Sequence, residues 1–95
     1  DIGGIKLAFH SYRALRRAAT EPLTAGGYSE DQQFFLALGE AWCAKARPEA
    51  ERLRVKIDPH SPPRFRVLGP LSNLPEFAEA FSCPSPPAEQ SCSVW

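Results

Sequence analysis

Residues 29–42 read SEDQQFFLALGEAW, and this stretch decides the fold because it specifies a helix from its first residue onward. Ser29, with Gln32 three residues later, has the spacing of a capping box. The apolar residues that follow cover nearly every side of that helix: Phe34, Phe35, Leu36, Leu38, Ala41 and Trp42. Such a helix is buried on most faces, and 95 residues offer little protein with which to cover it.

The segments on either side of this stretch also have helical patterns. Residues 2 to about 19 carry an apolar stripe at helical spacing. Pro48 suits the first turn of a short helix that ends near residue 57, and Asn73 with Glu76 predicts the cap of a last helix. We expect a mainly α protein. The basic cluster near the end of the first helix reads as solvated charge that suits the helix dipole: Arg13, Arg16 and Arg17.

Prolines set apart residues 58–72, the least regular part of the sequence. The stretch begins DPHSPPRFR, which places three prolines around His60. Gly69 and Pro70 form a typical turn pair. We expect a Pro-rich loop here, and rigid loops often hold functional side chains. We also expect an extended tail from Ser82.

Composition and motifs exclude several functions. Lys and Arg number 11, as do Asp and Glu, so no excess positive field favours a nucleic acid or an anionic membrane. No apolar run is long enough to cross a membrane, and the start of the chain lacks a signal-peptide pattern. The sequence contains no His-Glu-x-x-His, Cys-x-x-Cys, Gly-x-Ser-x-Gly or phosphate-binding glycine loop. The chain therefore carries no complete catalytic motif.

The three cysteines form an odd set, so at least one of them has no partner within the chain. Two interpretations remain open at this point. All three are reduced in a cytosolic protein, or their disulfide partners lie in polypeptide outside these residues.

Two histidines differ in their surroundings. His10 lies among polar neighbours on the first helix, which favours an exposed side chain over a metal ligand. His60 is held between prolines, with Asp58 before it and Arg66 after it, a setting that suits an oriented donor and a substrate clamp. From spacing alone, an ordinary surface histidine is still the stronger interpretation of His60.

Seven short blocks resemble the C-terminal end of a neprilysin-family peptidase: DIGGI at 1–5, QFFL at 33–36, WC at 42–43, RPE at 47–49, DPHSP at 58–62, FRV at 65–67 and CSVW at 92–95. The resemblance spans residues 1–95. It implies the C-terminal portion of a gluzincin (thermolysin-like, neprilysin-type) catalytic domain, whose family consists of zinc endopeptidases that cut oligopeptides. The zinc ligands and the general base are then expected upstream, so the chain alone should neither hold zinc tightly nor cleave peptides.

The resemblance assigns roles to matching residues. Asp1 resembles the family aspartate that orients a zinc-bound histidine through its second ring nitrogen. His60 resembles the histidine that donates a hydrogen bond to the tetrahedral oxyanion, and Asp58 is expected to orient it. Arg66 matches the arginine that binds a substrate backbone carbonyl.

Ala41 and Trp42 fall where the family lines the pocket for the first primed side chain, which generally prefers large apolar groups. Ala41 is smaller than the valine expected there, which shifts the preference toward bulkier groups. Plain core packing remains a near-even alternative for Trp42. Pro63 stands where the family often has glycine, and it is expected to stiffen the loop.

The resemblance also accounts for the unpaired cysteines. In the family, the cysteines that match Cys43, Cys83 and Cys92 all form disulfides with upstream cysteines. This implies an extracytoplasmic protein, whose partners are peptide substrates and the N-terminal part of the same polypeptide.

Two alternatives belong to other classes of protein. The first is a non-catalytic peptide-binding or scaffold protein derived from this lobe, although the presence of Asp1, His60 and Arg66 together favours an enzyme. The second is a free-standing helical interaction domain, which would have to cover Phe34, Phe35 and Trp42 itself or by oligomerising.

Overall fold

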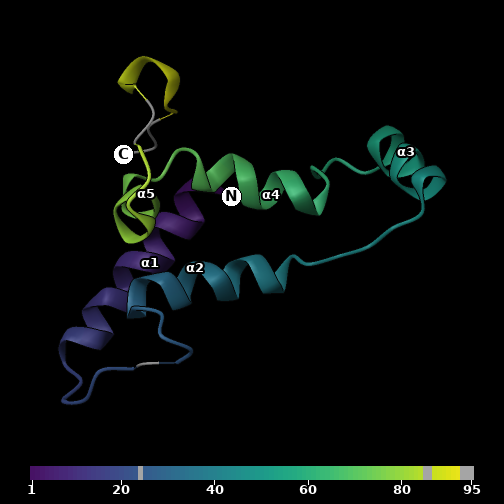
Figure 1. The fold of residues 1–95 in the computed structure, drawn as a ribbon. Helices are drawn as coiled ribbons and strands as arrows, with labels where there is room; N and C mark the ends of the chain where they lie inside the picture. Colours follow the sequence, from purple (N-terminus) through teal and green to yellow (C-terminus); the bar gives the residue numbers. More distant parts are fainter. Residues whose placement is uncertain (24, 85–86, 93–95) are drawn as a thin grey trace.

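The computed structural model describes residues 1–23, 25–84 and 87–92, and these residues form a mainly α structure (Figure 1). The mainly α class predicted from the sequence is confirmed. The elements are α1 (Ile2–Arg17), α2 (Glu30–Ala41), α3 (Pro48–Ile57), α4 (Pro63–Leu71), α5 (Pro75–Phe81) and a 3₁₀ turn, η1 (Ala88–Gln90). Among the described residues, no helix has the length and apolar character needed to span a bilayer.

The start of α2 follows the predicted capping box. The Ser29 hydroxyl accepts from the Gln32 backbone N–H at 3.2 Å, and the Gln32 side-chain oxygen accepts from the Ser29 N–H at 3.0 Å. Helix α3 also begins at Pro48, as predicted, since a proline in the first turn loses no helical hydrogen bond. Local sequence signals therefore located both starts correctly.

The prediction of irregular structure over residues 58–72 is wrong from residue 63 onward, because α4 occupies this stretch. Pro62 and Pro63 preset the backbone for a first helical turn, and the Pro62 carbonyl accepts from the backbone N–H groups of Phe65 and Arg66 at 2.9 and 3.2 Å. Pro70 lies inside the helix rather than in a turn. Like any proline inside a helix, it removes the one hydrogen bond that its own N–H would donate, and the helix ends one residue later. The loop that carries His60 is therefore only five residues long, from 58 to 62.

The predicted cap of the last helix is also wrong. Leu74 is the N-cap of α5 and makes no side-chain capping bond, because Pro75 in the first turn sets the start of the helix. The Asn73 side-chain oxygen instead accepts from the Cys92 backbone N–H at 2.5 Å. Glu76 contacts His10, which is exposed as predicted, at 3.1 Å between Oε1 and Nε2.

The tail after α5 is not wholly extended as predicted, because it contains η1. Only the first residue of the CSVW block, Cys92, belongs to the described part of the chain. Residues 93–95 of that block lie outside the described residues.

A small aromatic and aliphatic core joins four of the helices. Phe9 and Phe35 are 1% and 2% exposed, and Leu71 and Leu74 are buried beside them. The Phe9 and Phe35 rings stack with their centroids 4.8 Å apart. Helix α2 packs on α5, and α1 packs on α4. This core sets the relative position of the helices that carry the candidate site.

Helix α3 stands apart from this core (Figure 1), and none of its residues is buried. The radius of gyration is 15.4 Å, whereas a compact domain of this length has about 12 Å. The difference reflects the position of α3, which two extended connections hold away from the other helices (Figure 1).

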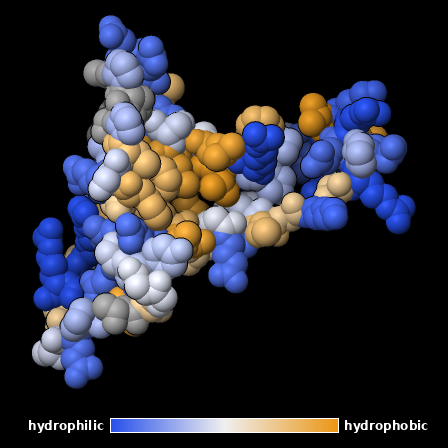
Figure 2. Space-filling view, in the orientation of Figure 1, coloured by the Kyte–Doolittle hydropathy of each residue, from blue (hydrophilic) through white to orange (hydrophobic). Residues whose placement is uncertain are grey.

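The predicted burial of α2 on most faces is not found within this chain, where Phe35 is its only fully buried residue. Leu36 is exposed, as are Phe65 and Leu68 on α4. Figure 2 shows apolar side chains gathered in the middle of the visible face, while the surface over α3 is mainly polar. The 95 residues do not cover the remaining faces of α2, as expected for a chain of this length.

Candidate functional site

Asp1 and Arg66 form the central pair of the candidate site. Arg66 Nε donates to Asp1 Oδ2 at 2.8 Å, and Nη2 donates to Oδ1 at 2.9 Å. Asp1 is the N-cap of α1, but its carboxylate makes no capping bond. Because α1 packs on α4, the carboxylate is available to the arginine instead. The two residues are 65 positions apart in sequence and meet only in the folded chain.

Trp42 completes this cluster from a third helix. The Arg66 guanidinium carbon lies 4.1 Å from the centroid of the Trp42 ring, which is a cation–π distance. Trp42 is the C-cap of α2 and is half-buried, whereas its neighbour Ala41 is exposed. The Nη1 group of Arg66 has no partner among the described residues. The guanidinium is thus fixed on two sides and keeps N–H donors for a further acceptor.

Asp58 and His60 form a second, local pair in the loop before α4. One oxygen of Asp58 accepts from the His60 backbone N–H and lies 2.9 Å from its ring Nδ1. The backbone N–H first, and then the ring, lower the pKa of Asp58 below its ordinary value. The histidine side chain is 66% exposed, with Nε2 free of partners in the described part of the chain. The structure does not bring His60 into contact with the Asp1, Arg66 and Trp42 cluster.

The cysteines and acidic residues form no metal centre within residues 1–23, 25–84 and 87–92. No three His, Cys, Asp or Glu side chains gather there in a way that suits a metal ion. Zinc, which the resemblance implies, therefore has no ligand set in the described part of the chain. Cys43, Cys83 and Cys92 are all exposed and unpaired.

Comparison with known proteins identifies a family whose pattern matches nearly the whole chain. The pattern of Peptidase family M13 matches residues 1–91. The chain belongs to this family. It is 42% identical over 100 residues to the endothelin-converting enzyme homolog of Locusta migratoria. It is 45% identical over 101 residues to the human endothelin-converting enzyme-like 1, and 42% identical over 100 residues to neprilysin-2 of Drosophila melanogaster. The resemblance to the neprilysin family is confirmed.

The M13 relatives are much longer than this chain. Each alignment covers all of the chain but only 14% of the locust protein and 13% of the human and fly proteins. The chain thus spans about one-seventh of the length of these relatives. The individual roles expected for its site residues remain predictions.

Two ion pairs that sequence analysis missed hold the helices of this M13 segment together. Arg13 Nη2 lies 2.6 Å from Asp31 Oδ2, and Arg16 Nη2 lies 2.7 Å from Glu30 Oε1. The pairing with Arg16, and then the N–H of Leu23, lower the pKa of Glu30. These arginines are therefore not simply solvated charge. The available signal was the acidic first turn of α2, which complements the basic last turns of α1.

Proposed function

We propose that this chain is the C-terminal part of the catalytic domain, of gluzincin type, in a zinc-dependent metalloendopeptidase that hydrolyses peptide bonds in oligopeptides. Membership of Peptidase family M13 supports metallopeptidase chemistry. The observation that carries the proposal is the cluster of Asp1, Arg66 and Trp42, which presents a fixed guanidinium with unused N–H donors.

Arg66 binds a backbone carbonyl of the substrate in this proposal. Asp1 fixes the plane of the guanidinium through two parallel hydrogen bonds, and Trp42 supports one face of it. A carbonyl oxygen that approaches the Nη1 edge therefore meets donors whose direction is already set. Such preorganisation lowers the entropic cost of aligning the peptide for attack.

Asp1 has a second proposed role toward a histidine outside this chain. Each carboxylate oxygen accepts one bond from Arg66, and each has a further lone-pair direction available. One of these accepts an imidazole N–H and fixes the tautomer of a metal-binding histidine. A zinc ion held by histidines outside this chain would supply Lewis-acid chemistry toward the scissile carbonyl and a bound water.

His60 supplies a hydrogen bond to the oxyanion in this proposal. With Nδ1–H directed to Asp58, Nε2 carries a proton only when the ring is an imidazolium, and in that form Nε2 donates to the oxyanion. The loop that holds His60 leads directly into α4, which carries Arg66. The loop of His60 and the helix of Arg66 are therefore consecutive in the chain.

Exposure of Cys43, Cys83 and Cys92 supports the proposed disulfides with upstream cysteines of the same polypeptide. Disulfides of this kind belong to an oxidising compartment, so we place the protein outside the cytoplasm. Mass analysis of the non-reduced complete gene product tests both points. Three free thiols in the secreted protein would contradict them.

Hydrolysis of an internally quenched oligopeptide by the complete gene product tests the proposed function. We expect cleavage that a zinc chelator stops and added zinc restores, whereas the 95-residue chain alone is expected to be inactive. His60→Gln is expected to lower kcat/KM by about 100-fold or more, as removal of one oxyanion donor does. His10→Gln is the matched control, since His10 is also exposed and beside a carboxylate. Saturable peptide binding without cleavage would indicate the non-catalytic alternative instead.

A further inference from the structure

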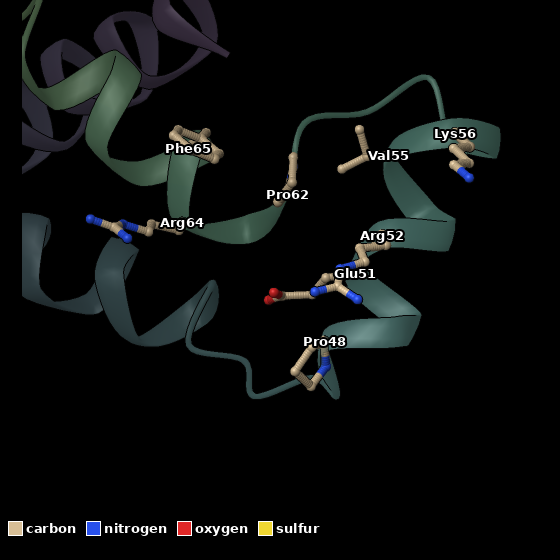
Figure 3. Close-up of a pocket in the computed structure, with 8 residues that line it drawn as sticks. All are labelled: Pro48, Glu51, Arg52, Val55, Lys56, Pro62, Arg64 and Phe65. Carbon is tan, nitrogen blue, oxygen red and sulfur yellow. The ribbon is translucent and has the colours of Figure 1, made fainter.

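Side-chain hydrogen bonds fix the end of the chain but not helix α3. The groove of about 740 Å³ between α3 and α4 is open, and no side-chain hydrogen bond joins the described residues that line it. Figure 3 shows the Arg64 and Lys56 side chains directed away from this gap and the Glu51 carboxylate directed into it. Around α5, by contrast, two half-buried amide side chains each hold a segment of backbone near an exposed cysteine.

Gln32 holds the last turn of α5. Its side-chain oxygen accepts from the Ser29 N–H in the capping box, and its Nε2 donates to the Ala80 carbonyl at 2.8 Å, across 48 positions of sequence. The Cys83 N–H donates to the Ala78 carbonyl at 2.9 Å, so Cys83 belongs to the same hydrogen-bonded turn. The start of α2 thereby fixes the backbone that carries the Cys83 thiol.

Ser82 gives a second indication that the backbone is held at this point. Among the described residues it is the only one other than glycine with a positive φ, at 53°. This left-handed conformation is unfavourable for a residue with a side chain, and it persists only where surrounding contacts fix it. The strained residue stands directly before Cys83.

Asn73 holds the segment of the second cysteine. Its Oδ1 accepts from the Cys92 backbone N–H at 2.5 Å, and its Nδ2 donates to the Gly69 carbonyl of α4 at 2.7 Å. The end of a chain frays unless a contact ties it down, and Asn73 ties Cys92 to the junction between α4 and α5. Cys83 and Cys92 are both exposed, so each thiol lies at the surface on backbone that an amide fixes.

We propose that Gln32 and Asn73 are positioning residues, which hold Cys83 and Cys92 in place for pairing with cysteines outside this chain. A fixed backbone raises the effective concentration of a thiol beside its partner, because less conformational freedom is lost when the bond forms. In each pairing, two protein thiols give up two protons and two electrons, and one oxidised glutathione accepts them to become two thiols. The inference deepens the proposed function and rests on its disulfides with upstream cysteines.

Redox equilibration of the complete gene product measures the effective concentration at each cysteine. The reduced protein is equilibrated with mixtures of reduced and oxidised glutathione, and free thiols are then alkylated. Digestion after glutamate separates the two cysteines for mass analysis, because Glu89 lies between them. Gln32→Glu keeps the capping acceptor but loses the donor to Ala80. We expect it to lower the effective concentration at Cys83 by about fivefold, as loss of one hydrogen bond does, and to change Cys92 by less than about twofold.

Variants of Asn73 give the reciprocal test. Asn73→Leu is expected to lower the effective concentration at Cys92 by about fivefold and to change Cys83 by less than about twofold. Asn73→Asp keeps an oxygen that accepts from Cys92, so we expect it to restore pairing; a loss equal to that of Asn73→Leu would overturn the role of Oδ1. Ser72→Ala is the matched control, since the Ser72 hydroxyl also donates to the Gly69 carbonyl, at 2.9 Å.

The pattern of losses separates positioning from general destabilisation. Equal losses at both cysteines in every variant would overturn the inference, as would unchanged pairing in Gln32→Glu and Asn73→Leu, which would leave the proposed disulfides in place. A parent protein that pairs Cys83 with Cys92, or keeps both as thiols at every glutathione ratio, would refute the disulfides and the inference together. Losses at the expected cysteine alone, in a protein that zinc does not activate, would support the positioning roles and refute only the peptidase function.

Discussion

The contact between Asp1 and Arg66 predicts a measurable coupling. In the complete gene product, Arg66→Lys keeps the positive charge but loses the planar fork and its stacking on Trp42. Asp1→Asn keeps the shape of the partner and removes its charge. If the two residues act as one unit, the effect of either change depends on whether the other partner is still present.

The expected size of the coupling follows from the geometry. Two charge-assisted hydrogen bonds at 2.8 and 2.9 Å join side chains that are 39% and 22% exposed, so water screens part of the attraction. We expect a coupling energy of about 1 kcal/mol between Asp1 and Arg66. Loss of the contact with Trp42 adds about 0.5–1 kcal/mol to the cost of Arg66→Lys. The total is about 1.5–2 kcal/mol, or a factor of about 10–30 in an equilibrium constant.

A double-mutant cycle measures this coupling in two ways. Urea unfolding gives the effect on the free energy of unfolding, and kcat/KM for the quenched peptide gives the effect on the transition state. We expect Arg66→Lys to be costly in the parent protein and much less costly in the Asp1→Asn background. Strictly additive losses in both measurements would refute the idea that Asp1 positions Arg66.

Three further predictions follow from local geometry. Ser29→Ala removes the capping box and is expected to lower the free energy of unfolding by about 1 kcal/mol in urea titrations; an unchanged urea midpoint would contradict this role of the cap. Ala41→Val narrows the pocket expected for the first primed side chain, so the ratio of kcat/KM for substrates with phenylalanine over alanine after the cleaved bond should fall. A rise in this ratio would refute the role of Ala41 in that pocket. His60 lowers the pKa of Asp58, so the stabilisation from their contact is complete above the ordinary value of 3.8 and is lost as the pH falls below it. NMR titration of the Asp58 carboxyl carbon checks this, and an apparent pKa at or above the ordinary value would contradict it.

The sequence was sufficient where the determining interactions are local. The capping box at Ser29 and the proline start of α3 depend on residues within one helical turn, and both are found where predicted. Asp58 and His60 are two positions apart, so their contact also follows from a short loop. Local interactions of this kind need no knowledge of the rest of the fold.

Prolines explain the error over α4. A run of prolines predicts a loop throughout, although a proline in the first turn of a helix is favourable. Pro63 occupies such a first turn, and Pro70 lies inside the helix one residue before its end. Burial of Leu71 in the hydrophobic core favours the helix over a loop.

Contacts between distant residues were beyond the reach of pattern analysis. The resemblance gave separate expectations for Asp1 and Arg66, but not their hydrogen bonds to each other. The arginines of α1 likewise have acidic partners on α2 that become visible only once the two helices pack. The position of α3 depends on the path of two connections, for which the sequence offers no local rule.

The separation of 65 positions between Asp1 and Arg66 also sets a schedule during biosynthesis. At about 5–20 residues per second, the ribosome needs roughly 3–13 seconds after making Asp1 before it makes Arg66. Until then the nascent chain lacks the arginine that would hold the aspartate in place. The contact between helices α1 and α4 that this pair makes therefore forms only after most of this segment has been synthesised.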